Sequence, residues 1–422
     1  MKSKIVEDQS EPEQQTASSA GAPESPKRRP GLVARAKSWI AGHRKVAISG
    51  QLAIVVILAA AVGLLATGCG AEDEIQAEAN KEEKRLLQPE LDALTAAGVP
   101  GAVLVVDDPQ ADPITVVSGV ADTESGRPVS ADDRFRIGSL TKPYVAVVVL
   151  QLAEEGTISL DDTVEEWLPG LVPNGSEITV EDLLGHRSGL FEYEEDPRVL
   201  APYLKGDFGY TWKPQELIRI STEHPPTAEP GTKVVYSNTN YTVLGLLIEA
   251  ATEHSLAAEL RQRIITPLGL EATSFAVGGK PEAPYARGYL AGGKQLLDVT
   301  EISPSHYWAA GNLVSTAGDV ARFYEALMEG ELLDESSMEA MTSYVTEAPG
   351  LERGLGVAHG DTECGTWTGH DGSVPGYDAI ARNLDTGRQV VVLTNSVTRG
   401  DAIGTPAAQK ALAEVVESAS CR

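Results

Sequence analysis

Positive charge is scarce in this sequence. Its 422 residues include 34 Lys and Arg against 61 Asp and Glu, which gives a formal net charge of -27 at pH 7. A protein that binds nucleic acid phosphates or an anionic lipid surface needs a local basic patch, and we find none in the part expected to fold. The composition therefore excludes a nucleic acid partner and favours a small uncharged or zwitterionic substrate.

Two well-defined catalytic motifs are also missing. The seven histidines form no His-Glu-x-x-His pattern, which argues against a metalloprotease, and the lack of a Gly-x-Ser-x-Gly elbow argues against an α/β-hydrolase. We interpret the consecutive residues His306, Tyr307 and Trp308 as an aromatic rim to a cleft rather than as metal ligands. We therefore predict no metal site and no cofactor.

Long apolar runs are rare, and one of membrane-spanning length lies near the N-terminus. Residues 1–45 are polar and rich in Ser, Glu, Gln and Pro, so we expect a disordered cytoplasmic tail. The apolar run from Val46 to Thr67 is close to the roughly 20 residues that cross a bilayer. Residues 46–68 are therefore predicted to be a transmembrane or signal segment.

The two flanks of this segment differ in charge. Seven basic residues and no acidic one lie between Lys27 and Lys45, and three acidic residues follow at 72–74. Basic residues stay on the cytoplasmic side, so the chain after Cys69 is predicted to lie outside the membrane. Small residues precede Cys69, and this sequence resembles a bacterial lipoprotein box, in which the Cys is lipidated. The alternative is an uncleaved signal anchor, and both tether the protein to the outer face of the cytoplasmic membrane.

Cysteine is almost absent, since only Cys364 and Cys421 remain besides Cys69. In an oxidising compartment an even pair predicts a disulfide, which would join the C-terminal tail to the body of the domain. Two buried free thiols are the alternative.

The remainder reads as one α/β domain over 89–422, preceded by a linker over 69–88 that grades into an amphipathic helix ending before Pro100. A mostly helical subdomain over about 160–308 interrupts a sheet that is built from both ends of the chain. The fold class is therefore an antiparallel sheet flanked by N- and C-terminal helices, with the helical subdomain inserted. The expected strands are 102–106, 114–117, 354–358, 366–368, 377–383 and 389–394, and the expected helices include 139–155, 180–184, 214–221, 241–252, 257–265, 317–329 and 406–418.

Ser139-Leu140-Thr141-Lys142 opens the buried helix and is the only Ser-x-x-Lys in the chain. Side chains three residues apart share one face of a helix, so Ser139 and Lys142 are placed to hydrogen-bond. A serine hydroxyl becomes a strong nucleophile when a neighbour takes its proton, and a lysine kept neutral by burial does so. The alternative is a helix-capping serine followed by a surface lysine.

Tyr236-Ser237-Asn238 follows 97 residues after Ser139, in a loop before the helix expected from Tyr241. A tyrosine near a cation relays a proton or acts as a phenolate, and an amide holds lysine and substrate in register. The alternative is a core aromatic followed by a capping Asn238.

His370-Asp371-Gly372 lies 134 residues beyond Tyr236, just before an expected strand, and is the only His-x-Gly. Gly372 lets a substrate backbone approach, and the N–H of Ser373 pairs with that of Ser139 as an oxyanion hole. The alternative is a turn histidine.

These three motifs, in this order and spacing, resemble the serine beta-lactamase and penicillin-binding protein superfamily. Its class C-like branch, the secreted D-alanyl-D-alanine carboxypeptidases, carries Ser-x-x-Lys, Tyr-x-Asn and His-x-Gly. The resemblance spans about Pro89 to Cys421. It implies catalysis by Ser139, Lys142 and Tyr236, with Asn238, His370, Gly372 and Ser373 contacting substrate.

The implied reaction is acylation of Ser139 by the D-Ala-D-Ala end of a peptidoglycan stem peptide, followed by hydrolysis, and β-lactams would acylate the same serine. One position departs from the family pattern. The strand before the third motif lacks the basic residue that holds the terminal carboxylate, which leaves Arg353 or His359 as substitutes.

Other functions stay open at this point. An esterase or a class C-type beta-lactamase shares the fold and the motifs, which do not separate these substrates. A cell-wall or β-lactam sensor without turnover is the alternative from another class, but it would not need both Lys142 and Tyr236.

Overall fold

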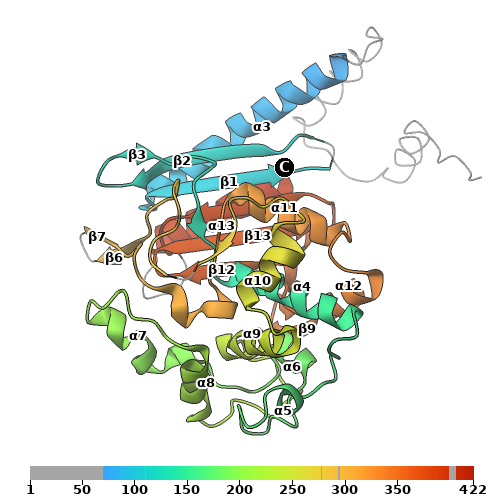
Figure 1. Cartoon of the computed structure of the whole chain (residues 1–422). Coiled ribbons are helices and arrows are strands. Elements are labelled where there is room, and N and C mark those ends of the chain that lie inside the picture. The colour runs from blue at the N-terminus through green and yellow to red at the C-terminus, as the bar shows by residue number, and fades with distance from the viewer. Residues whose placement is uncertain (1–69, 110, 277, 293–294, 399–404) are drawn as a thin grey trace, which may run out of the picture. The chain divides into compact units, whose positions relative to one another are not determined.

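The computed structural model describes residues 70–109, 111–276, 278–292, 295–398 and 405–422. The predicted tail, the apolar segment and Cys69 lie outside these ranges. Within them, no helix combines the length and the apolar character needed to cross a bilayer. Glu72–Arg422 forms one compact unit (Figure 1).

A nine-stranded antiparallel sheet forms the centre of this unit, in the order β3-β2-β1-β14-β13-β12-β11-β10-β9. Its N-terminal strands lie beside its C-terminal ones because β1 pairs with β14. The bounds are β1 Gly101–Asp107, β2 Ile114–Asp122, β3 Arg127–Pro128, β9 Val345–Ala348, β10 Leu351–Arg353, β11 Ala358–Thr362, β12 Gly365–Val374, β13 Tyr377–Leu384 and β14 Gln389–Thr394.

Two helices from opposite ends of the chain cover one face of the sheet. These are α3 (Gly70–Ala96) and α13 (Pro406–Cys421). Leu87, Leu91 and Leu94 of α3 are fully buried against outward-facing β1 and β14 side chains and against α13. This layer confirms the predicted flanking by N- and C-terminal helices (Figure 1).

The other face of the sheet packs on a much larger helical layer. The helix α4 (Thr141–Glu154) lies in its core and is apolar nearly all round, with every residue from Thr141 to Leu150 buried. The middle of the chain supplies the remaining helices of this layer together with short strands. They are α5 Val164–Trp167, α6 Val180–Leu184, α7 Pro197–Leu204, α8 Pro214–Thr222, α9 Asn238–Thr252, α10 Leu256–Leu260, α11 Ala317–Met328, α12 Glu335–Met341, β4 Phe135–Arg136, β5 Ser274–Phe275, β6 Tyr289–Gly292, β7 Gln295–Asp298 and β8 Leu313–Ser315.

Most predicted elements are confirmed, and three differ near the motifs. Ser139 lies in a 3-10 turn, Gly138–Leu140, and α4 starts after it. Asn238 is the first residue of α9, because Ser237 caps that helix by accepting from the N–H of Thr239. His370 lies inside β12 rather than before a strand, since pairing with β13 outweighs the weak strand preference of His, Asp and Gly.

The strand predicted over 354–358 is wrong. Residues 354–357 connect β10 to β11, and Gly354 lies so close to the carbonyl of Met341 that a Cβ would collide with it. Gly356 adopts a φ of +84°, which belongs to a turn rather than to a strand. The neighbouring runs 351–353 and 358–362 form the strands instead.

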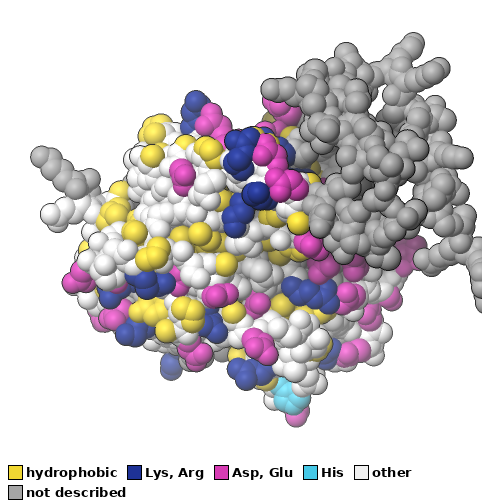
Figure 2. Space-filling model, turned by 90° about the horizontal axis from the view of Figure 1, so that it is seen from above, with side chains coloured by type: hydrophobic (Ala, Val, Ile, Leu, Met, Phe, Trp, Pro, Cys, Tyr) yellow, Lys and Arg dark blue, Asp and Glu magenta, His cyan; other side chains and the backbone are white. Residues whose placement is uncertain are grey.

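Charge is mixed on the surface. On the face shown in Figure 2, Lys and Arg side chains are scattered among Asp and Glu instead of forming one field. Near the C-terminus, Cys364 and Cys421 form the predicted disulfide, with Cα atoms 5.4 Å apart. It ties the end of α13 to the turn between β11 and β12.

Candidate active site

Ser139 lies in the turn before α4, directly against β12. Gly138 permits this approach, because it has a φ of +52° and a Cβ there would lie 2.8 Å from the amide nitrogen of Ser373. The Ser139 hydroxyl oxygen accepts from Lys142 Nζ at 2.8 Å and from the Tyr236 hydroxyl at 2.9 Å. The structure therefore brings the three predicted catalytic residues together.

Lys142 is fully buried at the centre of this cluster. Its Nζ also donates to Asn238 Oδ1 at 2.7 Å and to the Ala310 carbonyl at 2.9 Å. Both are pure acceptors, so they hold two N–H groups and leave the third tetrahedral direction pointing at Ser139. In the neutral amine that direction carries the lone pair.

Burial favours the neutral form of the Lys142 amine. It lowers the pKa of Lys142 to about 7, against the opposing effect of the Glu192 and Glu194 carboxylates and with a small contribution from Arg353. Both its orientation and its lowered pKa therefore suit Lys142 to take a proton from Ser139.

Tyr236 precedes α9, and its ring stacks on His186 with centroids 4.3 Å apart. The segment around His186 holds this loop, since its carbonyl accepts from Val235 N–H and its Nδ1 accepts from Ser237 N–H. Burial raises the pKa of Tyr236, although Arg353 and the bond to Ser139 oppose the shift. Tyr236 is thus a neutral phenol that donates a proton, not a standing phenolate.

The Asn238 amide is held from both ends. Its oxygen accepts from Lys142 and its Nδ2 donates to Glu194 at 2.8 Å, while its backbone N–H donates to Glu192. One Nδ2 hydrogen stays available to a ligand. Asn238 therefore positions Lys142 and also lines the cavity described below.

The third motif lies on β12 at an open edge. β11 pairs with β12 only from Gly365 to Gly369, so no strand of the described residues pairs with that edge from His370 onward. An extended substrate could pair there as an added strand. His370 is neutral, because burial and the cations Arg353 and Lys142 hold its pKa well below the usual range.

Gly372 contacts the turn that carries the nucleophile, whereas the sequence predicted only that it lets a substrate backbone approach. A Cβ at this position would collide with the carbonyl of Ile137 and would lie 3.0 Å from the amide nitrogen of Ser139. Gly372 thus lets β12 approach the nucleophile turn itself, and it brings the N–H of Ser373 near that of Ser139. This closeness suits an oxyanion hole made of the two backbone amides.

A cavity of about 500 Å³ opens over these residues and contains most predicted site residues. Arg353 also lines it, whereas His359 does not and instead stacks on Tyr344 at 4.4 Å. Arg353 pairs across the sheet with the small residue Ala358, its Nε donates to Glu347, and its Nη1 lies 3.3 Å from His370 Nε2. The lining residues include Ser139, Glu194, Tyr236, Asn238, Tyr307, Arg353, Ala358, Trp367, His370, Asp371 and Ser373.

Sequence reasoning missed Glu192, Glu194 and the Ala310 carbonyl. Burial and the neighbouring Glu192 raise the pKa of Glu194 to about 8, and its side chain is 23% exposed. An acidic run beside an aromatic residue carries no spacing signal, and a backbone carbonyl carries none at all. Of the predicted cleft rim His306, Tyr307 and Trp308, Tyr307 lines the cavity and His306 is fully buried.

Across the described ranges, no three His, Cys, Asp or Glu side chains gather as a metal-binding group. The cluster at Ser139 instead has the parts of a nucleophilic acyl-transfer site.

Comparisons with known proteins agree with this geometry. Penicillin-binding protein 4* of Bacillus subtilis (strain 168) is 27% identical over 303 residues, covering 66% of this chain and 64% of that relative. A D-stereospecific amidohydrolase from Streptomyces sp. superposes with a TM-score of 0.70 at 34% identity, covering 78% of this chain and 97% of that structure. D-amino acid amidase from Ochrobactrum anthropi SV3, complexed with D-phenylalanine, has a TM-score of 0.71 at 28% identity, covering 79% of this chain and 98% of that structure.

This chain spans 64% of the length of the Bacillus subtilis relative, so that protein's activity does not transfer as a whole. The beta-lactamase family model matches residues 78–414, which is most of the chain and includes all three motifs. The protein belongs to the beta-lactamase family and is a serine hydrolase of the beta-lactamase and penicillin-binding protein fold.

Proposed function

We propose that this protein hydrolyses D-aminoacyl bonds through an acyl-enzyme on Ser139, with the D-alanyl-D-alanine end of a peptidoglycan stem peptide as its substrate. One observation carries the proposal. Asn238 and Ala310 fix two of the three hydrogen-bonding directions of Lys142 Nζ, and the third faces Ser139 Oγ at 2.8 Å. That is the geometry of a general base on a nucleophile.

The proposed acylation uses these contacts in order. Lys142 takes the proton of Ser139 as the Oγ–C bond forms, and the N–H groups of Ser139 and Ser373 stabilise the oxyanion. As the C–N bond breaks, Tyr236 gives its proton to the leaving D-alanine nitrogen. Lys142, which now carries the Ser139 proton, then returns a proton to the Tyr236 oxygen, because the two groups lie next to each other around Ser139 Oγ.

The proposed deacylation returns the enzyme to its first state. A water molecule attacks the ester carbonyl, its proton passes to the neutral Lys142 and from there to Ser139 Oγ, and the Ser139 hydroxyl re-forms as the D-acyl product leaves. A β-lactam would open its ring on Ser139 in the same manner and so act as an acylating ligand.

Arg353 is the proposed partner of the terminal carboxylate. It is the basic side chain of the cavity lining that approaches His370, at 3.3 Å. Because Glu347 already accepts from its Nε, we expect Arg353 to hold a carboxylate less firmly than an unpaired arginine would. Carboxypeptidase activity is therefore expected to be weaker than esterase activity.

A second candidate substrate is a D-amino acid amide or ester with a free ammonium group. Glu194 favours it, since this carboxyl is partly exposed in the same cavity, on the side of Tyr307. The similarity to two D-specific amidohydrolases supports the same class.

A substrate panel tests the proposal. The exported domain is assayed on a diacetylated Lys-D-Ala-D-Ala peptide, D-alanine amide, their L-counterparts, a simple ester and a chromogenic cephalosporin. We expect turnover of D-configured substrates and of the ester, with little turnover of L-counterparts. Equal rates on D- and L-substrates would overturn D-specificity, and release of D-alanine faster than ester hydrolysis would reverse the expected order.

The same protein is proposed to be tethered to the outer face of the cytoplasmic membrane, through lipidated Cys69 or an uncleaved anchor. The basic flank before residue 46 supports this orientation. Metabolic labelling with a fatty acid, compared between wild type and Cys69→Ala, separates the two anchors. Recovery of the wild type in the soluble cytoplasmic fraction would contradict both.

A further inference from the structure

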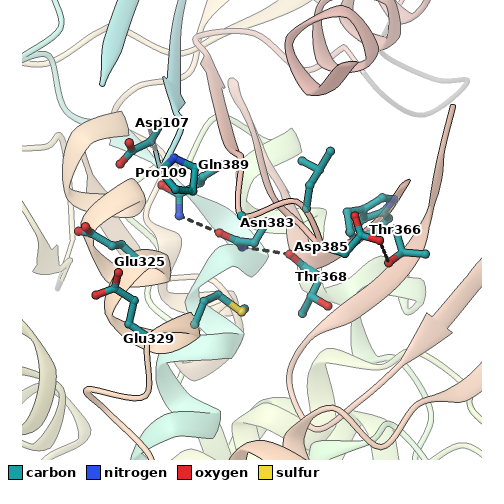
Figure 3. A pocket seen from close by; sticks show the side chains of 13 residues that line it. Asp107, Pro109, Glu325, Glu329, Thr366, Thr368, Asn383, Asp385 and Gln389 are labelled. Carbon is teal, nitrogen blue, oxygen red and sulfur yellow. Dashed lines mark hydrogen bonds between the residues drawn. The ribbon is translucent and has the colours of Figure 1, made fainter. Parts of the chain in front are cut away.

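A second cavity, of about 390 Å³, lies away from Ser139 at the far end of the central strands. It is formed by the end of β1, the start of β12, the turn from β13 to β14 and the end of α11 (Figure 3). Trp367 lines both this cavity and the one at Ser139. The mechanism proposed above uses none of the other residues here.

A row of polar side chains crosses the sheet at the base of this cavity. Asp107, Gln389, Asn383 and Thr368 face one another in register on four neighbouring strands. The Asn383 Nδ2 donates to the Thr368 carbonyl at 3.0 Å, and Gln389 Nε2 donates to Asn383 Oδ1 at 2.7 Å. Figure 3 shows this chain of bonds.

This chain leaves one acceptor unsatisfied. Because Asn383 directs its nitrogen to Thr368, its oxygen faces Gln389, and Gln389 has to donate with its own nitrogen. The Gln389 side-chain oxygen is then buried with no hydrogen-bond partner among the described residues, although Gln389 is only 5% exposed. A buried acceptor of this kind calls for a donor from outside the chain.

Carboxylates surround the same space. Asp107 on β1, Glu325 on α11 and Glu329 just after α11 lie on one side of the cavity, and Asp385 lies across from them (Figure 3). Glu325 pairs with Arg322 at 3.1 Å. Asp107, Glu329 and Asp385 form no ion pair with any Lys or Arg that the structure describes. Burial and the charges of Glu325, Asp108 and Glu329 raise the pKa of Asp107, as expected for carboxylates gathered without a cation.

The lining also contains the apolar side chains of Pro109, Met328, Trp367 and Leu384. A small metal ion does not fit this mixture, because no three ligand side chains of the described ranges converge on one point. We propose that this cavity binds an ammonium group on an aliphatic chain, as a diamine or a lysine side chain presents it. The carboxylates pair with the ammonium, the Gln389 oxygen accepts one N–H, and the apolar residues contact the methylene chain.

Calorimetric titration of the full chain tests the proposal with two probes, 1,5-diaminopentane and the methylamide of Nα-acetyl-lysine. We expect saturable 1:1 binding of at least one probe, weakened when salt is raised. Tighter binding of the diamine identifies a free diamine as the ligand, and tighter binding of the lysine derivative identifies a lysine side chain. No saturable binding of either probe would overturn the proposal.

Variants locate the site. Asp107→Asn with Glu329→Gln is expected to weaken binding at least tenfold, and Gln389→Leu several-fold, whereas Glu335→Gln on α12, which does not line the cavity, leaves it unchanged. Glu329 is exposed at the end of α11, so Glu329→Gln alone stays informative if a buried change prevents folding. Unchanged affinity in Glu329→Gln and in the double variant, or equal binding of Mg²⁺, would overturn the proposal.

Discussion

The two cavities at either end of β12 differ in how their polar groups are satisfied. Around Ser139, Lys142 has a partner for each of its N–H directions, and Asn238 is held from both ends. In the second cavity, a buried amide oxygen has no hydrogen-bond partner and three carboxylates have no Lys or Arg partner among the described residues. The two sites therefore differ in what they can bind or move. The network around Ser139 can transfer a proton between its own side chains, whereas the polar groups of the second cavity need a cation from outside the chain.

Lys142→Arg is the strongest way to break the first network. Arginine keeps the positive charge but does not release a proton at neutral pH, so kcat/KM is expected to fall by about 10²–10⁴-fold. Thermal unfolding checks that the variant is folded, and diamine binding in the second cavity should not change. A kcat/KM within tenfold of the wild-type value would show that Lys142 is not the general base.

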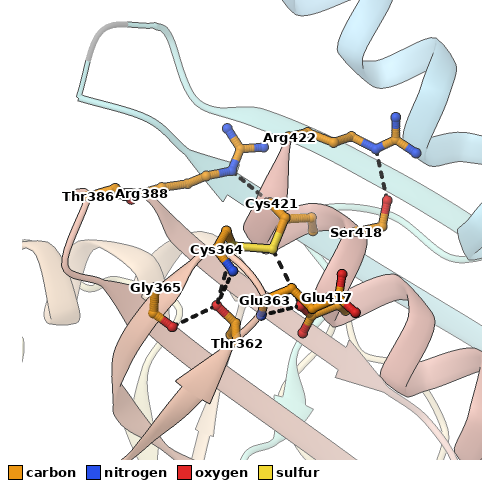
Figure 4. Close-up of a disulfide and its surroundings, with 11 residues drawn as sticks. Thr362, Glu363, Cys364, Gly365, Thr386, Arg388, Glu417, Ser418, Cys421 and Arg422 are labelled. Carbon is orange, nitrogen blue, oxygen red and sulfur yellow. Dashed lines mark hydrogen bonds between the residues drawn. A yellow bond between two sulfur atoms is a disulfide. The ribbon is translucent and has the colours of Figure 1, made fainter. Parts of the chain in front are cut away.

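The disulfide between Cys364 and Cys421 ties α13 to the start of β12, the strand that both cavities share (Figure 4). Removing it therefore tests the stability of the fold separately from the chemistry of either cavity. The two cysteines are 57 residues apart, and cross-linking a loop of that length contributes about 4 kcal/mol by restricting the unfolded chain. Cys421→Ser should lower the free energy of unfolding by about that amount and leave kcat/KM unchanged at 25 °C. Denaturant unfolding of wild type and variant, each with and without reductant, measures it, and equal stability in all four samples would contradict it.

Arg353→Met sharpens the assignment of the carboxylate partner. Loss of a charge-assisted hydrogen bond, about 1.5–3 kcal/mol, should raise KM roughly tenfold or more for a D-Ala-D-Ala peptide with a free terminus. The same peptide with an amidated terminus should be unaffected, as should both peptides in a His359→Ala control, since His359 does not line the cavity. An equal loss on both peptides would show that Arg353 acts through Tyr236 or His370 instead.

Glu194→Gln tests the electrostatic tuning of Lys142 and has the smallest expected effect. Lys142 is active when neutral, so kcat/KM should rise with pH through its pKa of about 7. Glu194 raises that pKa only when it is ionised, and its own pKa of about 8 leaves it mostly protonated near pH 7. Replacing it should therefore move the acidic side of the pH–rate profile only slightly, toward lower pH. Glu195→Gln is the matched control, because Glu195 is exposed and does not contribute to the pKa of Lys142. A shift to higher pH would contradict this electrostatic account.

The sequence predicted the layers of the fold and the three motifs because these depend on local patterns. Apolar runs such as Val390 to Leu393 match a strand buried on both faces, and Ser139 and Lys142 are related by helical spacing. The structure confirms both. Short strands such as β10 have no such pattern, since they form only by pairing with β9 and β11.

The unpredicted parts of the site depend on contacts between distant segments. The Ala310 carbonyl meets Lys142 across 168 residues, and Glu192 and Glu194 reach the cluster from a 3-10 turn between α6 and α7. Arg353 was one of two candidates in the sequence, and only the pairing of β10 with β11 directs it to the cavity. The positions of these residues in the site depend on tertiary pairing, which no local pattern in a single sequence encodes.

The proposed mechanism depends most directly on acylation of Ser139. The protein is incubated with a fluorescent penicillin and digested, and the adduct is located by mass spectrometry, beside a Ser139→Ala control. We expect one covalent adduct on Ser139 and none on the variant. No adduct, or an equal adduct on Ser139→Ala, would contradict it.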